Sequence, residues 1–335
     1  MMQLPERLRR AIIEELAQAD SAALPQAVAD LTQRYQYQFA ERQTKTYIAS
    51  AAHRAAYLCA RLPATYASVR AALATTREAL PEVTFSSLLD LGAGPGTAMW
   101  AAAETFGKME QMTAVERDRD LIELGRRLAE QSEPLARAEW LRLNLSEETN
   151  FAPHDLVVAS YSIGELAESA RSRLVRSAWQ ATTKTLLLVE PGTPRGFANI
   201  LTARQELLAL GANLVAPCPH SQDCPMAGND WCHFAARVER SSLHRRVKAG
   251  TLGYEDEKFA YLAAARFPIE PPAARVIRRP LKREGHIHLE LCAAEGLRRT
   301  IVGRKDKAAF RQARKADWGA AWADSDGKHL SEQTL

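Results

Sequence analysis

The segment Asp90-Leu-Gly-Ala-Gly-Pro-Gly96 narrows the folds open to this chain more than any other stretch. It ends a short apolar run that begins at Ser86, and a segment of helical character, 97–106, follows it. Glycines at the junction of a strand and a helix let the backbone approach a ligand closely, and open α/β sheets bind ligands at the carboxyl ends of their strands. The sequence therefore predicts an α/β fold with a ligand site at this loop.

The residues after the loop alternate between short apolar runs and helical segments. This alternation predicts a doubly wound, mostly parallel, Rossmann-like sheet. Beyond the strand that ends at the glycine loop, further strands are expected at 112–116, 138–145, 155–162, 184–190, 274–279 and 286–292.

The chain divides into three predicted regions. Residues 1–82 are expected to form a helical N-terminal domain without a chemical motif, and residues 83–303 to form the α/β core, with a cysteine-rich loop at 212–236. Residues 304–335 are expected to be a basic extension with a disordered tail. No apolar run approaches the roughly 20 residues that span a bilayer, and the first residues lack the apolar part of a secretory leader. A cytoplasmic location without membrane association is expected.

A second feature supports a nucleotide site at the glycine loop. Glu116 ends the next expected strand, beyond the helical segment that follows Gly96. An acidic side chain at this place can accept hydrogen bonds from both ribose hydroxyls. The residues alone leave two cofactors open, NAD and S-adenosylmethionine, beside a glycine turn used only for packing.

The pattern D-x-G-x-G-x-G, with Asp90 first, resembles motif I of the class I S-adenosylmethionine-dependent methyltransferases. The resemblance implies that Glu116 holds the ribose and that Asn144 lies near the adenine, where the family often has Asp. It also implies cofactor contacts at the glycine loop and at the end of the fourth strand, from Asp90, Gly92, Ala93, Gly94, Gly96 and Ser160. That strand end carries no Asn/Asp-Pro-Pro-Tyr motif and no cysteine nucleophile, so no catalytic residue is assigned.

Four of the five cysteines are placed as metal ligands would be. Cys218, Cys224 and Cys232 lie close together in one loop and Cys292 follows much later, whereas Cys59 stands alone and is expected to pack in a core. Thiolates favour zinc or iron–sulfur clusters. The C-x5-C-x7-C spacing lacks the close pairs of a zinc ribbon, which favours a loop around a larger object.

The net charge of +4 hides an asymmetry along the chain. Residues 236–315 hold 20 Lys and Arg against 9 Asp and Glu, a net of +11, so the remaining residues sum to 4 − 11 = −7. A basic region of this kind either contacts polyanions such as nucleic acids or is a solvated surface.

Together these residues resemble the methyltransferase-like protein family of the mitochondrial small ribosomal subunit and its bacterial relatives. The resemblance is carried by Arg61-Leu-Pro-Ala-Thr-Tyr66, the glycine loop, Glu190-Pro-Gly-Thr193, the cysteine loop, Arg279-Pro280, Gly285-His286 and Ala313-Arg-Lys-Ala-Asp-Trp-Gly319. It implies S-adenosylmethionine binding and a 4Fe–4S cluster on Cys218, Cys224, Cys232 and Cys292, with zinc as the alternative.

The resemblance also implies a partner and a location. The partner would be the small ribosomal subunit with its 16S-type rRNA, bound during assembly or translation by a protein that is a monomer when free. The location would be the bacterial cytoplasm, or the mitochondrial matrix for eukaryotic relatives. Turnover stays open: an active rRNA methyltransferase is the first alternative, and a small-molecule methyltransferase with structural zinc is the second. The residues expected to contact RNA phosphates are Arg245, Arg246, Lys248, Arg278, Arg279, Lys282, Arg311, Arg314 and Lys315.

Overall fold

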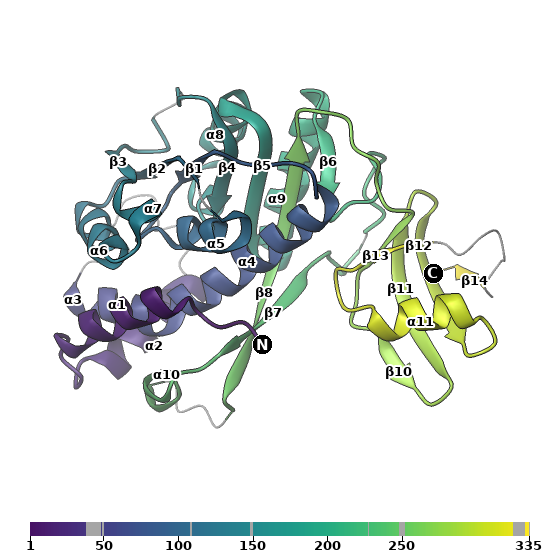
Figure 1. Ribbon diagram of the computed structural model, residues 1–335, viewed down its shortest axis with the longest axis horizontal. Helices are drawn as coiled ribbons and strands as arrows, with labels where there is room; N and C mark the ends of the chain where they lie inside the picture. The colour runs from purple at the N-terminus through teal and green to yellow at the C-terminus, as the bar shows by residue number, and fades with distance from the viewer. Residues whose placement is uncertain are drawn as a thin grey trace.

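A computed structural model describes residues 1–37, 48, 50–107, 109–147, 150–226, 228–247, 252–323 and 332–334. Its larger sheet has the strand order β3-β2-β1-β4-β5-β8-β6, and β7 pairs with the outer half of β8 (Figure 1). The strands are β1 (Ser87–Leu91), β2 (Gln111–Glu116), β3 (Glu139–Arg142), β4 (His154–Ser160), β5 (Thr182–Pro191), β6 (Asn213–Ala216), β7 (Phe234–Glu239) and β8 (Tyr254–Ala265).

The first five strands of this sheet are all parallel, whereas β8 runs antiparallel to β5, β6 and β7. The predicted Rossmann-like α/β sheet is therefore confirmed, as a mixed sheet. The sequence patterns did not predict β6, β7 and β8. The inner half of β8 is the alanine-rich run Phe259–Ala265, which is buried on both faces and so lacks the alternation that marks a half-exposed strand.

Helices cover both faces of the larger sheet. Along β4 the side chains alternate between two apolar clusters: Leu156 and Val158 belong to one cluster, Val157 and Ala159 to the other. The helices are α1 (Glu6–Ala17), α2 (Leu24–Tyr37), α3 (Ala51–Ala56), α4 (Leu62–Ala79), α5 (Thr97–Phe106), α6 (Arg119–Ala129), α7 (Glu133–Ala136), α8 (Glu168–Ala181), α9 (Pro194–Ala209) and α10 (Ser242–Val247), with a π-helical turn η2 (Tyr57–Arg61) and a 3-10 turn η3 (Ile163–Glu165).

The N-terminal helices share their core with the sheet. The first apolar cluster joins Leu8 of α1 and Leu73 of α4 to Leu88 of β1 and Tyr261 of β8. Helix α4 is continuous with η2 and packs against α5, β7 and β8. Residues 1–82, expected as a domain, thus have no separate apolar cluster among the described residues.

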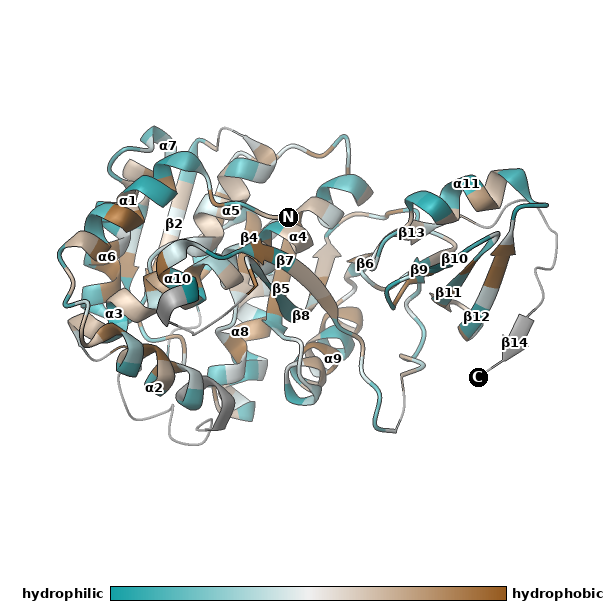
Figure 2. Cartoon of the chain, turned by 90° about the horizontal axis from the view of Figure 1, so that it is seen from below, coloured by the Kyte–Doolittle hydropathy of each residue, from teal (hydrophilic) through white to brown (hydrophobic). Residues whose placement is uncertain are grey.

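A second sheet follows the first and lies beside it in Figures 1 and 2. Its side chains alternate along β11, where Ile287, Leu289 and Leu291 face inward as expected and the residues between them are half-buried. The order is β13-β9-β11-β12-β14, with β10 also pairing with β11. Its elements are β9 (Ala274–Val276), β10 (Leu281–Arg283), β11 (His286–Ala293), β12 (Gly296–Gly303), α11 (Lys307–Lys315), β13 (Ala321–Trp322) and β14 (Glu332–Thr334).

The second sheet has an apolar cluster of its own, in which α11 takes part. The cluster begins at Ala274 and includes Val302, Ala309, Ala313 and Trp322. Packing therefore changes near residue 274, and not at residue 304, where the basic extension was expected to begin. Most of the tail predicted to be disordered lies outside the described residues. Among the helices described, none is both long and apolar enough to cross a bilayer.

Candidate functional site

The glycine loop lies between β1 and α5 and needs its glycines. Gly92, Gly94 and Gly96 have φ of +77°, +54° and +82°, which side chains with a Cβ rarely adopt. The amides of Gly92 and Ala93 donate to the carbonyl oxygen of Val115 at 2.9 and 3.0 Å, which anchors the loop to β2. The loop therefore presents backbone to a pocket at the carboxyl end of the sheet.

Glu116 ends β2 and reaches back to this loop. Its Oε2 accepts from the Gly94 amide at 2.9 Å, and its Oε1 accepts from the amides of Arg117 and Asp118 at 2.8 and 2.9 Å. Burial raises the pKa of Glu116, and these three donors act in the opposite direction. Because Oε2 keeps a second lone pair, Glu116 can still accept from a ligand hydroxyl.

Asp90 lies beneath the loop and is fully buried. By ordinary hydrogen-bond geometry, neither of its carboxyl oxygens has a partner among the described residues. Burial, together with the nearby charge of Glu116, raises the pKa of Asp90 to about 7. A buried carboxyl with so little hydrogen bonding is costly, and the backbone of Met99 offsets only part of the rise in its pKa.

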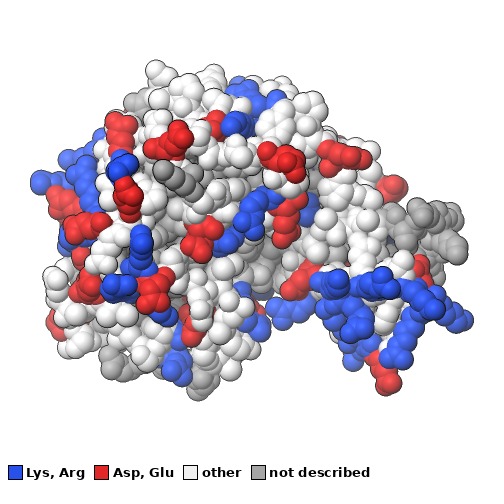
Figure 3. All heavy atoms as spheres, in the orientation of Figure 1, with Lys and Arg blue, Asp and Glu red and all other residues white. Residues whose placement is uncertain are grey.

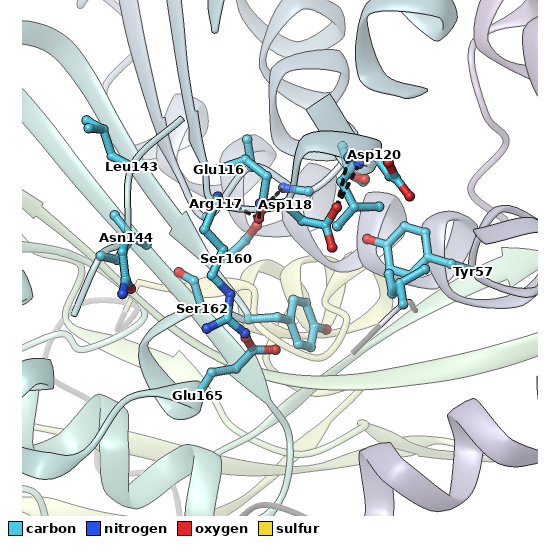
Figure 4. A pocket seen from close by; sticks show the side chains of 18 of the residues that line it. Tyr57, Glu116, Arg117, Asp118, Asp120, Leu143, Asn144, Ser160, Ser162 and Glu165 are labelled. Atoms are coloured by element: carbon cyan, nitrogen blue, oxygen red, sulfur yellow. Dashed lines mark hydrogen bonds between the residues drawn. The ribbon is translucent and has the colours of Figure 1, made fainter. Parts of the chain in front are cut away.

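The loop and Glu116 open on a pocket of about 660 Å³. Figure 4 shows Glu116, Ser160 and Ser162 in its middle, with Asn144 and Tyr57 on opposite sides. Of the residues predicted to bind the cofactor, the pocket is lined by Gly92, Ala93, Gly94, Glu116, Asn144 and Ser160, while Asp90 and Gly96 lie behind it.

The sequence motifs did not indicate the side of the pocket that comes from the N-terminal helices. Tyr57 and Arg61, at the two ends of η2, line the pocket together with Thr65 of α4. Arg61 forms an ion pair with Glu257 of β8, with Nη2 and Oε1 3.2 Å apart. A π-helical turn is rare and is often found at functional sites, but no residue pattern announces it. The segment beginning at Arg61 was noted only as part of the family resemblance.

The end of β4 carries backbone strain at the edge of the same pocket. Tyr161 has φ of +56°, although it is not glycine. Its hydroxyl donates to Ser68 Oγ at 2.9 Å and lies 3.3 Å from Glu257 Oε1. Strain of this kind persists only where surrounding contacts enforce it, and it clusters at functional sites.

Glu190, at the carboxyl end of β5, is buried behind the pocket and does not line it. Its two oxygens accept from Asn199 Nδ2 at 3.0 Å and from the Gly164 amide at 3.2 Å. Burial raises the pKa of Glu190 to about 7. Glu190 thereby supports η3, whose last residue, Glu165, does line the pocket.

The four clustered cysteines converge on a second cavity, of about 40 Å³. Cys218 and Cys224 follow β6, and Cys232 shortly precedes β7. Cys292 comes from β11 of the second sheet, and its Sγ lies 3.5 Å from His220 Nε2. The cavity therefore joins the two sheets. Cys59 is absent from its lining and is buried in η2.

Burial and mutual proximity dominate the electrostatics of these thiols. Burial raises the pKa of Cys292 to about 12 and that of Cys232 well above its usual range, and charges on the other cysteines add to both shifts. Burial also raises the pKa of Cys218, which the guanidinium of Arg204 opposes. Within the described ranges, no three His, Cys, Asp or Glu side chains are grouped so that they could hold a metal ion.

Basic side chains gather over the second sheet and α11, seen at the right of Figure 3. Arg311, Arg314 and Lys315 are exposed on α11, and Arg245 is exposed on α10. Of the other residues predicted to contact RNA, three interact with groups of the protein itself and two lie outside the described residues or side chains. Arg278 pairs with Asp230, Arg279 pairs with Asp256, Lys282 donates to the carbonyl oxygen of Arg314, and Lys248 and the side chain of Arg246 are not among the described atoms.

Two curated relatives resemble this chain in sequence. The human ribosome assembly protein METTL17, mitochondrial, is 29% identical over 286 residues, which cover 78% of this chain and 61% of METTL17. The mitochondrial Rsm22-cox11 tandem protein 2 of Schizosaccharomyces pombe is 27% identical over 320 residues, covering 79% of this chain and 42% of the relative. The chain thus spans less than two thirds of either relative.

Solved structures that align with this chain include methyltransferases. Magnesium protoporphyrin IX methyltransferase of Synechocystis PCC 6803, with bound S-adenosylmethionine, aligns at a TM-score of 0.40 and 12% identity over 75% of this chain and 99% of that chain. Precorrin-6y C5,15-methyltransferase of Geobacter metallireducens aligns at a TM-score of 0.39 and 12% identity, over 58% of this chain and 87% of that chain.

The sequence model of one protein family matches a range of this chain that holds most of the pocket lining, the cysteine cavity and most of the second sheet. The sequence model of the family described as mitochondrial small ribosomal subunit Rsm22 matches residues 51–323. This match extends over more than half of the 335 residues. The chain belongs to the Rsm22 family.

Proposed function

We propose that this protein binds S-adenosylmethionine, a 4Fe–4S cluster and small-subunit rRNA, and that it acts in ribosome assembly or translation. The observation that carries the proposal is the single family match, which spans both the pocket and the four cysteines. The human relative is named a ribosome assembly protein. We infer a cytoplasmic location for a bacterial member, a matrix location for eukaryotic relatives, and a monomer before it meets the subunit.

The pocket at the glycine loop fits S-adenosylmethionine. Glu116 would accept from the ribose hydroxyls, the loop backbone at Gly92 and Gly94 would follow the methionine portion, and Asn144 would face the adenine. When bound, the cofactor supplies an activated methyl group. Calorimetry with S-adenosylmethionine and the full chain tests this part: an absence of binding heat at millimolar ligand would contradict it.

The cysteine cavity suits an iron–sulfur cluster by its donors. Four soft sulfur ligands from two sheets surround it. When bound, the cluster would supply a link between the sheets.

Anaerobic purification tests the cluster directly. Iron, acid-labile sulfide and zinc are measured on the full chain and on the Cys292→Ser and Cys59→Ser variants. We expect iron and sulfide in the unchanged protein and in Cys59→Ser, and their loss in Cys292→Ser. Stoichiometric zinc without iron would instead support the small-molecule methyltransferase with a structural metal.

Whether the protein transfers methyl groups is decided by its behaviour on assembling small subunits. The end of β4 offers Tyr161 and Glu165 to the pocket but no Asn/Asp-Pro-Pro-Tyr motif. We therefore favour a binding role for S-adenosylmethionine. Radiolabelled methyl transfer to small-subunit rRNA that disappears in Glu116→Ala would establish the alternative, an active rRNA methyltransferase.

A further inference from the structure

Two arginines are buried at the cysteine cavity. Arg204 of α9 and Arg275 of β9 line the cavity, and each is only 3% exposed. In the described part of the chain, the two guanidinium groups donate hydrogen bonds to backbone carbonyl oxygens and not to carboxylates. A buried charge is costly unless an opposite charge compensates it.

Backbone carbonyls satisfy these guanidinium groups only in part. Arg204 Nη2 donates to the carbonyl oxygens of His220 and Gln222 at 3.0 and 2.6 Å, but its buried Nε has no hydrogen-bond partner among the described residues. Arg275 Nε donates to the carbonyl oxygen of Pro217 at 2.8 Å, and its Nη1 to that of Gly319 at 3.1 Å. Carbonyl dipoles orient a cation but carry no net charge.

Both arginines are attached to the segments that carry the cysteines. Arg275 is the register partner of Cys292 across β9 and β11, and its carbonyl acceptor Pro217 directly precedes Cys218. Arg204 holds the turn at His220, between Cys218 and Cys224. One positive charge comes from each side of the cavity, since α9 packs on the larger sheet and β9 belongs to the smaller one.

We propose that Arg204 and Arg275 are built-in countercharges that make the cavity a site for a dianion, and that they set the reduction potential of the cluster bound there. This inference rests on the proposed cluster. A 4Fe–4S core with four thiolates is a dianion when oxidised and gains one more negative charge on one-electron reduction. Two buried cations stabilise both states and stabilise the reduced state more, so they raise the potential and favour retention of the cluster.

The test separates charge from hydrogen bonding. Arg204 and Arg275 are each changed to Gln, which removes the charge, and to Lys, which keeps it. Arg266→Gln is the matched control, because that guanidinium donates to the carbonyl oxygen of Thr182 and stacks over the ring of Trp179, outside the cavity. The full-length variants are reconstituted anaerobically, assayed for iron and sulfide, and titrated by visible spectroelectrochemistry.

We expect each Gln variant to retain less cluster, and the cluster that remains to show a more negative midpoint, with the Lys variants and Arg266→Gln close to the unchanged protein. A tenfold lower preference for the reduced cluster corresponds to about 59 mV for a one-electron couple. Equal midpoints in the Gln and Lys variants at one position would overturn the inference. If a Gln variant does not fold, the Lys variant at the same position is the test. A midpoint of the Lys variant that differs from that of the unchanged protein would also overturn the inference.

The unchanged protein separates this inference from the proposed function. If it carries no iron and sulfide after reconstitution, the proposed cluster fails and the inference fails with it. If it carries a cluster whose midpoint is the same in the Gln variants, only the countercharge role fails.

Discussion

The carboxylate of Glu116 accepts a hydrogen bond from the amide of Gly94 at 2.9 Å. One acidic side chain therefore fixes the glycine loop and faces the ligand pocket. Loss of its charge should weaken both the loop and any contact with a ribose.

We expect Glu116→Gln to weaken S-adenosylmethionine binding by about tenfold to a hundredfold, because hydrogen bonds to a charged group contribute roughly 1.5–3 kcal/mol. Isothermal titration calorimetry measures the change. Glu133→Gln on α7 is the control, since its partner Arg137 is exposed and neither residue lines the pocket. Equal affinities for the two variants would remove Glu116 from the binding site.

Gly125 of α6 should tolerate no side chain. A Cβ there would lie 2.3 Å from the Trp140 ring and 3.1 Å from the backbone carbon of Pro95 in the loop. We expect Gly125→Ala to destabilise the protein by about 1–3 kcal/mol, the usual cost of overpacking. Urea unfolding measures it against Gly253→Ala, where a Cβ meets open space. Unchanged stability of Gly125→Ala would mean that Trp140 can move.

The pKa of Glu190 makes stability depend on pH. Burial raises it to about 7 in the folded protein, against roughly 4.3 when unfolded. The folded state therefore holds the proton more tightly, and the stability from this group, complete below about pH 4, is lost as pH rises through 7. The free energy of unfolding of the unchanged protein should therefore fall, relative to that of Glu190→Gln, by on the order of 2 kcal/mol between about pH 5 and 8. Glu168→Gln, exposed on α8, should show no such trend in urea unfolding.

Removal of the proposed cluster should loosen the second sheet more than the first. Only Cys292 ties β11 to the cavity, whereas three cysteines belong to loops of the larger sheet. We expect amide hydrogen exchange of β9 and β11 to rise at least about tenfold after chelation of the metal, while β1 and β2 stay protected. Equal loosening of both sheets would show that the cluster supports the whole chain.

The exposed basic side chains of α11 should account for part of any RNA affinity. Replacing Arg311, Arg314 and Lys315 with Gln should reduce the slope of log affinity against log salt by about 0.7–0.9 for each phosphate that is no longer neutralised. Filter binding with small-subunit rRNA at several salt concentrations measures the slope. Arg10→Gln with Arg126→Gln, exposed on α1 and α6, is the control. A slope unaffected by the α11 changes would place the RNA elsewhere.

The local parts of the site could be predicted from the sequence. The glycine loop and Glu116 follow from a strand-loop-helix pattern and a fixed spacing, and the structure places both at one pocket. The alternation along β11 likewise placed Ile287 and Leu291 inward and Cys292 on the opposite face. These features depend on neighbours in the chain, which a sequence displays.

The distant parts could not be predicted in the same way. Tyr57 lines the pocket because a π-helical turn places it there, and Arg204 lines the cysteine cavity because α9 packs beside β8. Neither residue stands in a motif, since each position depends on tertiary packing. The boundary near Ala274 was missed for a related reason: short strands of a second sheet look the same as further strands of the first.

The ion pair between Arg61 and Glu257 joins residues that are 196 positions apart. The described residues that line the pocket all precede Glu257 in the chain, so a growing chain carries its ligand contacts before it has the ion-pair partner of Arg61. Ligand affinity that depends on this ion pair would report on completed synthesis: a nascent chain ending before β8 would hold Arg61 less firmly at the pocket, and the finished protein would be the form that competes for ligand.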